Sequence, residues 1–280
     1  DISNRGIELT INAIPVQNED WQWSTTLNLS HNSNRVKKLS NAAYSVSYQD
    51  LGYPWIAGNT GVAVQRLMEG CPIGQFYTYE FAGHDADGVS QFWVHGPVTG
   101  QRTGEKTIKP QDTDRTKTGS AQPKLTLGWN NTLSYKNWSF NAFFNSAFGV
   151  QRLNALRFAM NSKIGNSRMF TDADFLKEIG KTMPNPNVAN NNYIGASSKW
   201  VENANYFRCE NITLAYDMPK SMTKFADIRL SFSVQNLFTI TNYKGSNPAG
   251  YNGDGDATGG IDCGTYPTPR TFTFGARFNF

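Results

Sequence analysis

The sequence has few charged residues and no long hydrophobic run. Asp, Glu, Lys and Arg make up 17% of its 280 residues, below the roughly 25% of typical soluble domains. Its uninterrupted apolar runs are only a few residues long, which excludes a membrane-spanning helix, because such a helix needs about 20 apolar residues. The net charge of +4 is dispersed along the chain and therefore does not indicate a nucleic-acid partner.

Residues that bind metals or act as nucleophiles are also scarce. The three cysteines show no C-x-x-C spacing and the three histidines do not cluster, so we predict no zinc site, no cofactor and no enzyme. The adjacent His84 and Asp85 are expected in an inner turn, away from any surface substrate. A disulfide between Cys263 and another loop stays open. The residues concerned are Cys71, Cys209, Cys263, His31, His84 and His95.

Aromatic residues, in contrast, are abundant and lie in alternating patterns. They form 13% of the chain, although the mean hydropathy is only −0.51. The last residues place Phe272, Phe274, Ala276, Phe278 and Phe280 on one side of an extended segment and polar residues on the other. Such alternation up to a terminal aromatic is typical of a barrel strand with one face in lipid and the other in water. We therefore predict an all-β protein, a transmembrane antiparallel β-barrel.

Nine segments share this alternation, and several reach ten residues or more. Strands of globular proteins average about 5–6 residues, whereas a strand crossing a bilayer needs about 9–11. A soluble β-sandwich would explain the alternation but not these lengths. The predicted strands are 6–14, 20–32, 73–82, 89–95, 124–135, 138–148, 206–216, 226–240 and 272–280.

The connections between these segments alternate between short and long. The long ones, 35–72, 96–123, 149–205 and 241–270, are expected on the outer side, because outer-membrane barrels have short periplasmic turns and longer outer loops. Nine strands that end in the periplasm must begin outside. A single-chain bacterial barrel has an even strand count and begins in the periplasm, so we expect residues 1–280 to be part of a larger barrel.

Four motifs resemble the C-terminal third of SusC/RagA-type TonB-dependent outer-membrane transporters. The resemblance implies a C-terminal part of a barrel of about 22 strands, with an N-terminal plug domain that is absent from this chain. One departure lies at Ser246–Ala249, where the family often has an acidic residue around the proline. The motifs are Asn4–Leu9, Glu69–Tyr77 with Phe81–Gly83, Gln235–Thr239 with Asn242–Gly245, and Tyr266–Thr271.

The same resemblance implies a function and partners. It suggests energised import of large nutrients, oligosaccharides or peptides, across the outer membrane of a Gram-negative cell. The implied partners are a SusD-like surface lipoprotein, the TonB complex, the rest of the barrel with its plug, and outer-membrane lipid. Two alternatives stay open: a passive porin, and a soluble or surface β-protein that binds glycans.

Candidate contact residues lie in the long loops. Tyr53, Trp55, Tyr193 and Trp200 are aromatic, and aromatic side chains stack on sugars or anchor protein partners. Substrate contact, partner contact and packing within the loops are the three alternatives for them. A polar lumenal wall is expected from Glu8, Glu80, Glu210, Asp227, Arg229 and Arg277.

The stretch 253–262 contains Asp254, Asp256 and Asp262 among glycines. Oxygen-rich flexible loops suit calcium, but the spacing of an EF-hand is missing. A solvated, glycine-rich outer loop is the favoured interpretation, and calcium is the weaker one.

Overall fold

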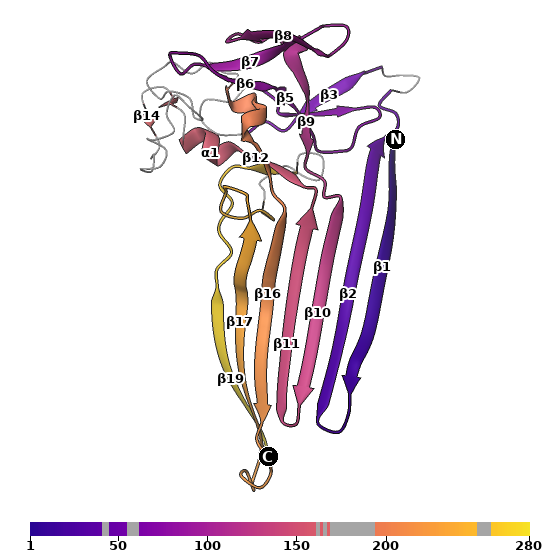
Figure 1. Cartoon of the computed structure of the whole chain (residues 1–280), viewed down its shortest axis with the longest axis vertical. Coiled ribbons are helices and arrows are strands. Elements are labelled where there is room, and N and C mark those ends of the chain that lie inside the picture. Colours follow the sequence, from indigo (N-terminus) through magenta and orange to yellow (C-terminus); the bar gives the residue numbers. More distant parts are fainter. Residues whose placement is uncertain (41–44, 55–61, 161–162, 165–166, 169–193, 251–258) are drawn as a thin grey trace.

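The structure is a computed structural model that describes residues 1–40, 45–54, 62–160, 163–164, 167–168, 194–250 and 259–280. Two parts follow one another along its long axis. One is a tall sheet of long strands, here called the wall, and the other is a body of loops and short elements at the upper end, here called the cap (Figure 1). Within the described ranges, no helix combines the length and the apolar character needed to cross a membrane.

The wall is a seven-stranded antiparallel sheet in the order β1-β2-β10-β11-β16-β17-β19. Each strand pairs with the next wall strand along the chain, so the wall is a simple meander. Its strands are between 9 and 16 residues long, enough to cross a bilayer. They are β1 (Ile2–Gln17), β2 (Trp21–Val36), β10 (Leu125–Tyr135), β11 (Trp138–Phe148), β16 (Tyr206–Asp217), β17 (Asp227–Thr241) and β19 (Thr271–Asn279).

The lower connections of the wall are short, and the tightest joins β10 to β11 at Lys136 and Asn137. Lys136 has a φ of 50°, a left-handed conformation that tight two-residue turns require. The upper connections are 37–124, 149–205 and 242–270, and they build the cap. The N-terminus lies at the upper end of the wall and the C-terminus at the lower end (Figure 1).

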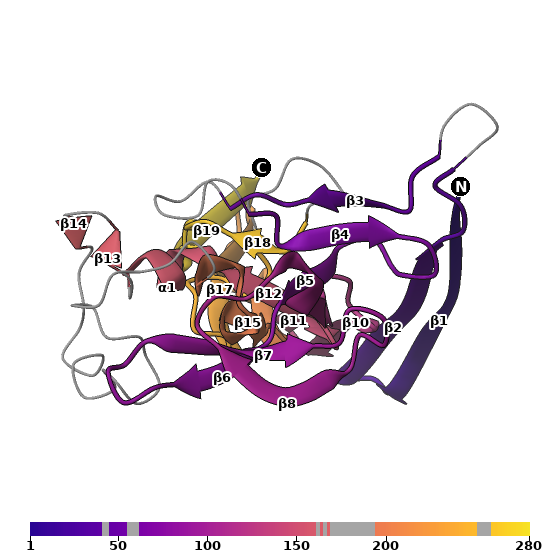
Figure 2. The ribbon, with the colours of Figure 1, turned by 90° about the horizontal axis from the view of Figure 1, so that it is seen from above.

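The described part of the cap contains three small sheets of three or four strands, one two-stranded sheet and short helices, which lie over the end of the wall when seen from above (Figure 2). The connection 37–124 forms the first two sheets and the 3-10 helix η1 (Asp112–Asp114). One consists of β3 (Tyr48–Leu51), β4 (Gln65–Met68), β5 (Gln75–Tyr79) and β9 (Arg115–Ser120), and the other of β6 (Phe81–His84), β7 (Ser90–His95) and β8 (Arg102–Thr107).

The third sheet joins the other two upper connections. In it, β12 (Gln151–Asn154) lies between β15 (Val201–Asn203) and β18 (Ile261–Asp262). Beside it are the helix α1 (Ala155–Met160), the 3-10 helices η2 (Ile194–Ala196) and η3 (Ser198–Trp200), and the hairpin β13 (Lys163–Ile164) with β14 (Ser167–Arg168).

The main hydrophobic core lies in the cap and not in the wall. Phe76, Phe92, Leu153 and Trp200 are fully buried and belong to one cluster. In contrast, Leu125, Phe140, Leu230 and Phe274 of the wall are not among the buried residues, and Phe274 is 81% exposed. The wall is therefore a sheet without a dry core of its own, as a lipid-facing wall requires.

Two of the nine predicted wall strands are wrong. Segments 73–82 and 89–95 form β5 and β7 of the cap, so Gly83–Gly88 is not an inner turn and the number of long upper connections in the described wall is three. Most residues of β5 are buried, as in an ordinary globular strand. Alternation alone does not separate the two kinds of strand, but length does, because β5 has 5 residues and β7 has 6. The wall has seven strands, which is an odd number like the predicted nine. The chain therefore still begins at the end of the wall opposite to its C-terminus, as predicted.

Candidate functional site

One face of the wall is polar, and its side chains are hydrogen-bonded across the strands. The register places Glu8 opposite Ser30 and Arg229 opposite Arg277 on this face. The hydroxyl and amide groups form pairs 2.8–3.0 Å apart, namely Thr10 with Asn28, Thr26 with Asn12, Asn141 with Asn130, and Thr213 with Ser233. These pairs make the face largely hydrophilic across the described strands, which suits a water-filled lumen.

The opposite face is apolar and exposed. Ile7, Leu9 and Ile11 follow one another on this face of β1 and are 73%, 50% and 46% exposed. Two indoles here donate to polar side chains, from Trp129 Nε1 to Thr25 Oγ1 at 2.9 Å and from Trp23 Nε1 to Asn131 Oδ1 at 3.2 Å. Polar groups facing hydrocarbon need such internal partners. This face therefore suits contact with lipid acyl chains.

Aromatic rings gather at the lower end of the apolar face. Trp21 stacks on Tyr135 with ring centroids 4.2 Å apart, and the rings of Trp138 and Tyr216 are 4.6 Å apart. Amphipathic rings prefer the boundary between hydrocarbon and headgroups. Their position marks the lower edge of the apolar band.

In the cap, one carboxylate joins two arginines and fixes the sheet of β3, β4, β5 and β9. Asp50 accepts from Arg66 Nε at 2.7 Å and from Arg115 Nη1 at 3.0 Å. The Arg66 guanidinium also lies over the rings of Tyr48 and Tyr77, at 3.9 and 4.2 Å from their centroids. Burial alone would raise the pKa of Asp50, but the Arg66 hydrogen bond and both positive charges outweigh it and lower that pKa.

A second ionic group holds the sheet of β6, β7 and β8 at the top of the molecule. Arg102 donates two hydrogen bonds to Glu80, and the His95 ring nitrogen Nε2 lies 3.2 Å from the same carboxylate. The backbone N–H of His95 donates to Asp114 Oδ1 at 2.9 Å. The hydrogen bond from Arg102 is the main cause that lowers the pKa of Glu80. Glu80 was predicted to line the lumen and instead lies in the cap.

The loop 242–270 is fastened from inside the cap. The Tyr243 hydroxyl donates to the buried Asp262 Oδ2 at 2.7 Å, and burial followed by this carboxylate raises the pKa of Tyr243. Glu202 accepts from the backbone N–H of Lys244 at 3.0 Å and from Arg157 Nη1 at 2.8 Å. These bonds connect the loop to β15 and α1.

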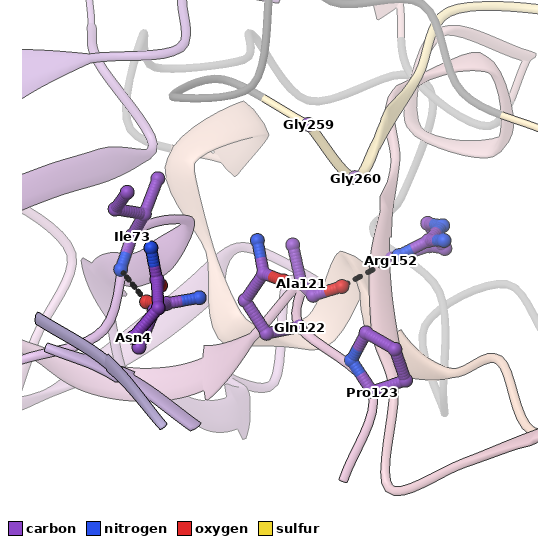
Figure 3. A pocket seen from close by; sticks show the side chains of 9 residues that line it. Asn4, Ile73, Ala121, Gln122, Pro123, Arg152, Gly259 and Gly260 are labelled. Carbon is purple, nitrogen blue, oxygen red and sulfur yellow. Dashed lines mark hydrogen bonds between the residues drawn. The ribbon is translucent and has the colours of Figure 1, made fainter. Parts of the chain in front are cut away.

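A pocket of about 340 Å³ lies where the cap meets the polar face of the wall (Figure 3). Its side chains offer several amide groups and one guanidinium, and none of its lining residues is acidic. Arg152 Nη1 donates to the Ala121 carbonyl at 3.0 Å, and the Ile73 N–H donates to Asn34 Oδ1 at 2.7 Å. The lining residues are Asn4, Asn34, Ile73, Ala121, Gln122, Pro123, Arg152, Gly259 and Gly260. Such a polar pocket can hydrogen-bond a solute that enters the lumen.

Two of the four predicted contact aromatics, Tyr53 and Trp200, lie within the described residues. Tyr53 is partly exposed on the cap, at 41%. Trp200 is fully buried against Phe158, which for this residue favours packing within the loops among the three alternatives. A large aromatic in a long loop is often needed for such a core. Trp55 and Tyr193 lie outside the described residues.

The calcium interpretation is not supported at Asp262. Its Oδ1 accepts from the N–H groups of Gly264 and Thr265 and from the Thr265 hydroxyl, while its Oδ2 accepts from Tyr243. Both oxygens are therefore used within the protein. Asp254 and Asp256 lie outside the described residues, and the described part of the chain contains no group of three metal-binding side chains. Cys71, Cys209 and Cys263 form no disulfide with one another.

Sequence reasoning missed the charged groups of the cap and the pocket. Asp50 and Arg115 are 65 residues apart, and nothing in their local sequence marks them as partners. Asp50, Arg66 and Arg115 lie within a single long connection, and this was the one feature of the sequence that could have indicated that they pair. The pocket gave no signal, because its residues come from six separate segments.

Comparisons with known proteins agree with this fold. No family model matches the chain. It is 31% identical to the TonB-dependent receptor P3 of Formosa agariphila and covers 29% of that protein. It is 27% identical to the TonB-dependent receptor SusC of Bacteroides thetaiotaomicron and covers 26% of it. Both alignments include 100% of this chain, which therefore spans less than a third of these relatives.

Solved structures show the same architecture. The RagAB peptide transporter superimposes with a TM-score of 0.79 at 23% identity, over 100% of this chain and 29% of the matched one. The same importer in its "open-open" state gives a TM-score of 0.78. The relatives and neighbours are receptors or importers by name, in agreement with the prediction that the chain is not an enzyme. Over its full length the chain is therefore similar to a portion of the TonB-dependent receptors, SusC among them, and its fold is that of a portion of the RagAB transporter, as the resemblance of its motifs predicted.

Proposed function

We infer that this chain supplies wall strands and outer loops to a TonB-dependent importer of large nutrients in the outer membrane. The observation that carries this proposal is the two-faced wall, apolar and exposed on one side and hydrogen-bonded and polar on the other. The polar face would line the path of the solute, and the cap would form part of its outer entrance. The relatives named TonB-dependent receptors support the proposal.

The proposed importer works with a SusD-like surface lipoprotein and draws energy from the TonB complex. Its cargo would be an oligosaccharide or a peptide. The polar pocket below the cap supports a hydrogen-bonding cargo, because the amides and the guanidinium of its lining can donate to oxygen-rich groups. Tyr53, which is the more exposed of the two predicted aromatics that the structure describes, is the proposed contact residue on the outer surface.

Uptake in cells that carry the full-length gene tests this proposal. Deleting the gene should abolish growth on one class of oligosaccharide or peptide, and a plasmid copy should restore it. Deleting tonB should abolish the same uptake. Uptake that continues without TonB would instead indicate a passive porin.

The glycan-binding alternative has its own test. The full-length protein should fractionate with the outer membrane and need detergent to stay monodisperse, because its apolar face is exposed over the whole wall. A monodisperse species without detergent would contradict the transporter and favour a soluble binding protein.

A further inference from the structure

Phe143 of β11 lies on the polar face of the wall. It is directly opposite Asn130, whose Oδ1 accepts from Asn141 on the same face at 3.0 Å. The register defines a row across the wall with one residue from each strand, and Phe143 is the only apolar member of this row. The row consists of Asn12, Thr26, Asn130, Phe143, Asn211, Gln235 and Thr271.

The ring of Phe143 lies along the wall, over a glycine. Its Cε2 atom is 3.8 Å from the place that a Cβ atom on Gly128 would occupy, so the ring reaches across to the neighbouring strand β10. The side chain is half-buried, and the stacked rings of this part of β11 belong to Phe144 on the opposite face. Phe143 therefore offers an apolar surface on the polar side of the wall, which costs free energy unless a ligand covers it.

Hydrogen-bond donors lie next to this ring. Asn28 uses its carbonyl for the Thr10 hydroxyl, and Asn130 uses its carbonyl for Asn141. Among the described residues, the Nδ2 amides of Asn28 and Asn130 have no partner. Asn28 Nδ2 is 4.0 Å from the same Cβ position on Gly128 that Phe143 approaches. Two amide groups can thus donate to a ligand that lies on the ring.

A hydrogen-bond acceptor lies one position higher on the same face. Glu210 is the extra residue of a β-bulge in β16, opposite the step from Phe143 to Phe144. Its Oε2 accepts a hydrogen bond from Asn145 Nδ2, which places the carboxylate on the polar face. Within the described part of the chain, its Oε1 has no partner. Bulges often aim a side chain towards a functional site.

We propose that these groups form a stacking site for one sugar ring of an oligosaccharide, with Phe143 as its platform. A sugar ring presents C–H groups on its faces and hydroxyls at its rim, so it can pack on an aromatic ring while its hydroxyls bond to amides and a carboxylate. Peptide side chains are usually bound in separate pockets, whereas the row around Phe143 is polar and belongs to an open sheet. The proposal deepens the proposed function and rests on it, because the polar face must line the path of the solute.

The charges at this height favour a sugar without acidic groups. The Glu210 carboxylate repels an anion on the ring. Arg208, which is directly opposite Asn145, already donates to Thr239 Oγ1 at 3.0 Å and to Asn247 Oδ1 at 2.7 Å. An uncharged oligosaccharide therefore fits this site better than an acidic one.

Fluorine NMR of the full-length protein in detergent tests the site, with para-fluorophenylalanine at position 143 as the reporter. The probes are maltoheptaose, cellohexaose, xylohexaose and mannohexaose, and the comparison probe is an uncharged glycine-serine peptide of similar mass. At least one sugar should shift the signal, and the peptide should not. The matched control carries the label in place of Phe140, on the apolar face of the same strand, and its signal should stay in place. A signal at position 143 that no sugar shifts, or that the peptide shifts equally, would overturn the proposal.

Affinity for the sugar that shifts the signal is an independent measurement. Phe143→Ala should weaken binding roughly ten-fold, Glu210→Gln should weaken it several-fold, and Phe143→Tyr should retain it. Thr273→Ala, on the same face of β19, should leave it unchanged. Unchanged binding in Phe143→Ala, with lower thermal stability as the sole effect, would show that the ring packs against other parts of the protein. TonB-dependent uptake of peptides alone would contradict the sugar site and leave the proposed importer standing.

Discussion

At the scale of single residues, buried hydrogen bonds hold the cap together. The Tyr243 hydroxyl reaches Asp262 inside it, and both side chains are almost completely buried. Removing one partner of a buried hydrogen bond leaves the other without its full set of bonds, at a cost of roughly 1–3 kcal/mol. The Tyr243 hydroxyl is therefore one of the contacts that hold the loop 242–270, together with Glu202 and Gln65.

Replacing Tyr243 with phenylalanine tests that dependence. We expect Tyr243→Phe to increase amide hydrogen exchange in loop 242–250 and around Asp262, because the carboxylate loses a donor. The highly exposed Tyr266 provides the control, and Tyr266→Phe should leave exchange unchanged. Equal exchange in both variants would mean that the hydroxyl contributes nothing to the loop.

The lowered pKa of Glu80 predicts how the stability of the cap changes at acidic pH. Its pKa lies below its ordinary value of 4.5, with the Arg102 hydrogen bond as the largest cause. A carboxyl with a lowered folded pKa adds stability above its unfolded pKa, and this stability is lost as the pH falls through the folded value. The sheet of β6, β7 and β8 should therefore stay protected from hydrogen exchange at pH 4.5 and lose protection below it.

The matching variant is Arg102→Gln. It should move the loss of protection in β7 upward, towards the ordinary glutamate range, because the main cause of the lowered pKa is gone. Lys109→Gln, on an exposed residue beyond β8, should leave the midpoint in place. A midpoint that is the same in all three proteins would contradict the role of this ion pair.

At the scale of elements, each wall strand has one apolar face, which suits lipid, and one polar face, which suits water. Phe274 and Thr273 are neighbours in β19 on opposite faces. A lysine on the lipid face near the bilayer centre costs about 2–4 kcal/mol, whereas lumenal positions tolerate charge. We expect Phe274→Lys to lower the urea midpoint of the full-length protein in lipid vesicles, and Thr273→Lys to change it little. The reverse order would show that the two faces have been assigned the wrong way round.

The long strands could be predicted from sequence, and the cap strands could not. The seven wall strands alternate over 9 residues or more, and β11 was predicted with both of its ends. The short β5 and β7 also alternate, but their burial depends on loops distant in sequence. For the same reason, the charged side chains of the cap could not be paired in advance, and the buried position of Trp200 could not be predicted.

At the scale of the whole molecule, the wall separates an outer end from an inner end. Val98 lies in the cap and Met222 in the longest lower turn, and both are strongly exposed. In intact cells, a membrane-impermeant maleimide should label Val98→Cys and not Met222→Cys, in a background with Cys263→Ser. After lysis both should react. Labelling of position 222 alone in intact cells would invert the proposed orientation.

The cross-connections inside the cap have a consequence for motion. Gln65 Nε2 donates to the Gly259 carbonyl, the Phe81 N–H donates to Ser198 Oγ, and the Leu153 N–H donates to the Gly260 carbonyl. These bonds join all three upper connections across a shared core. A displacement of one upper connection should therefore be transmitted to the other two, so we expect the cap to respond to a pulling force as one rigid body.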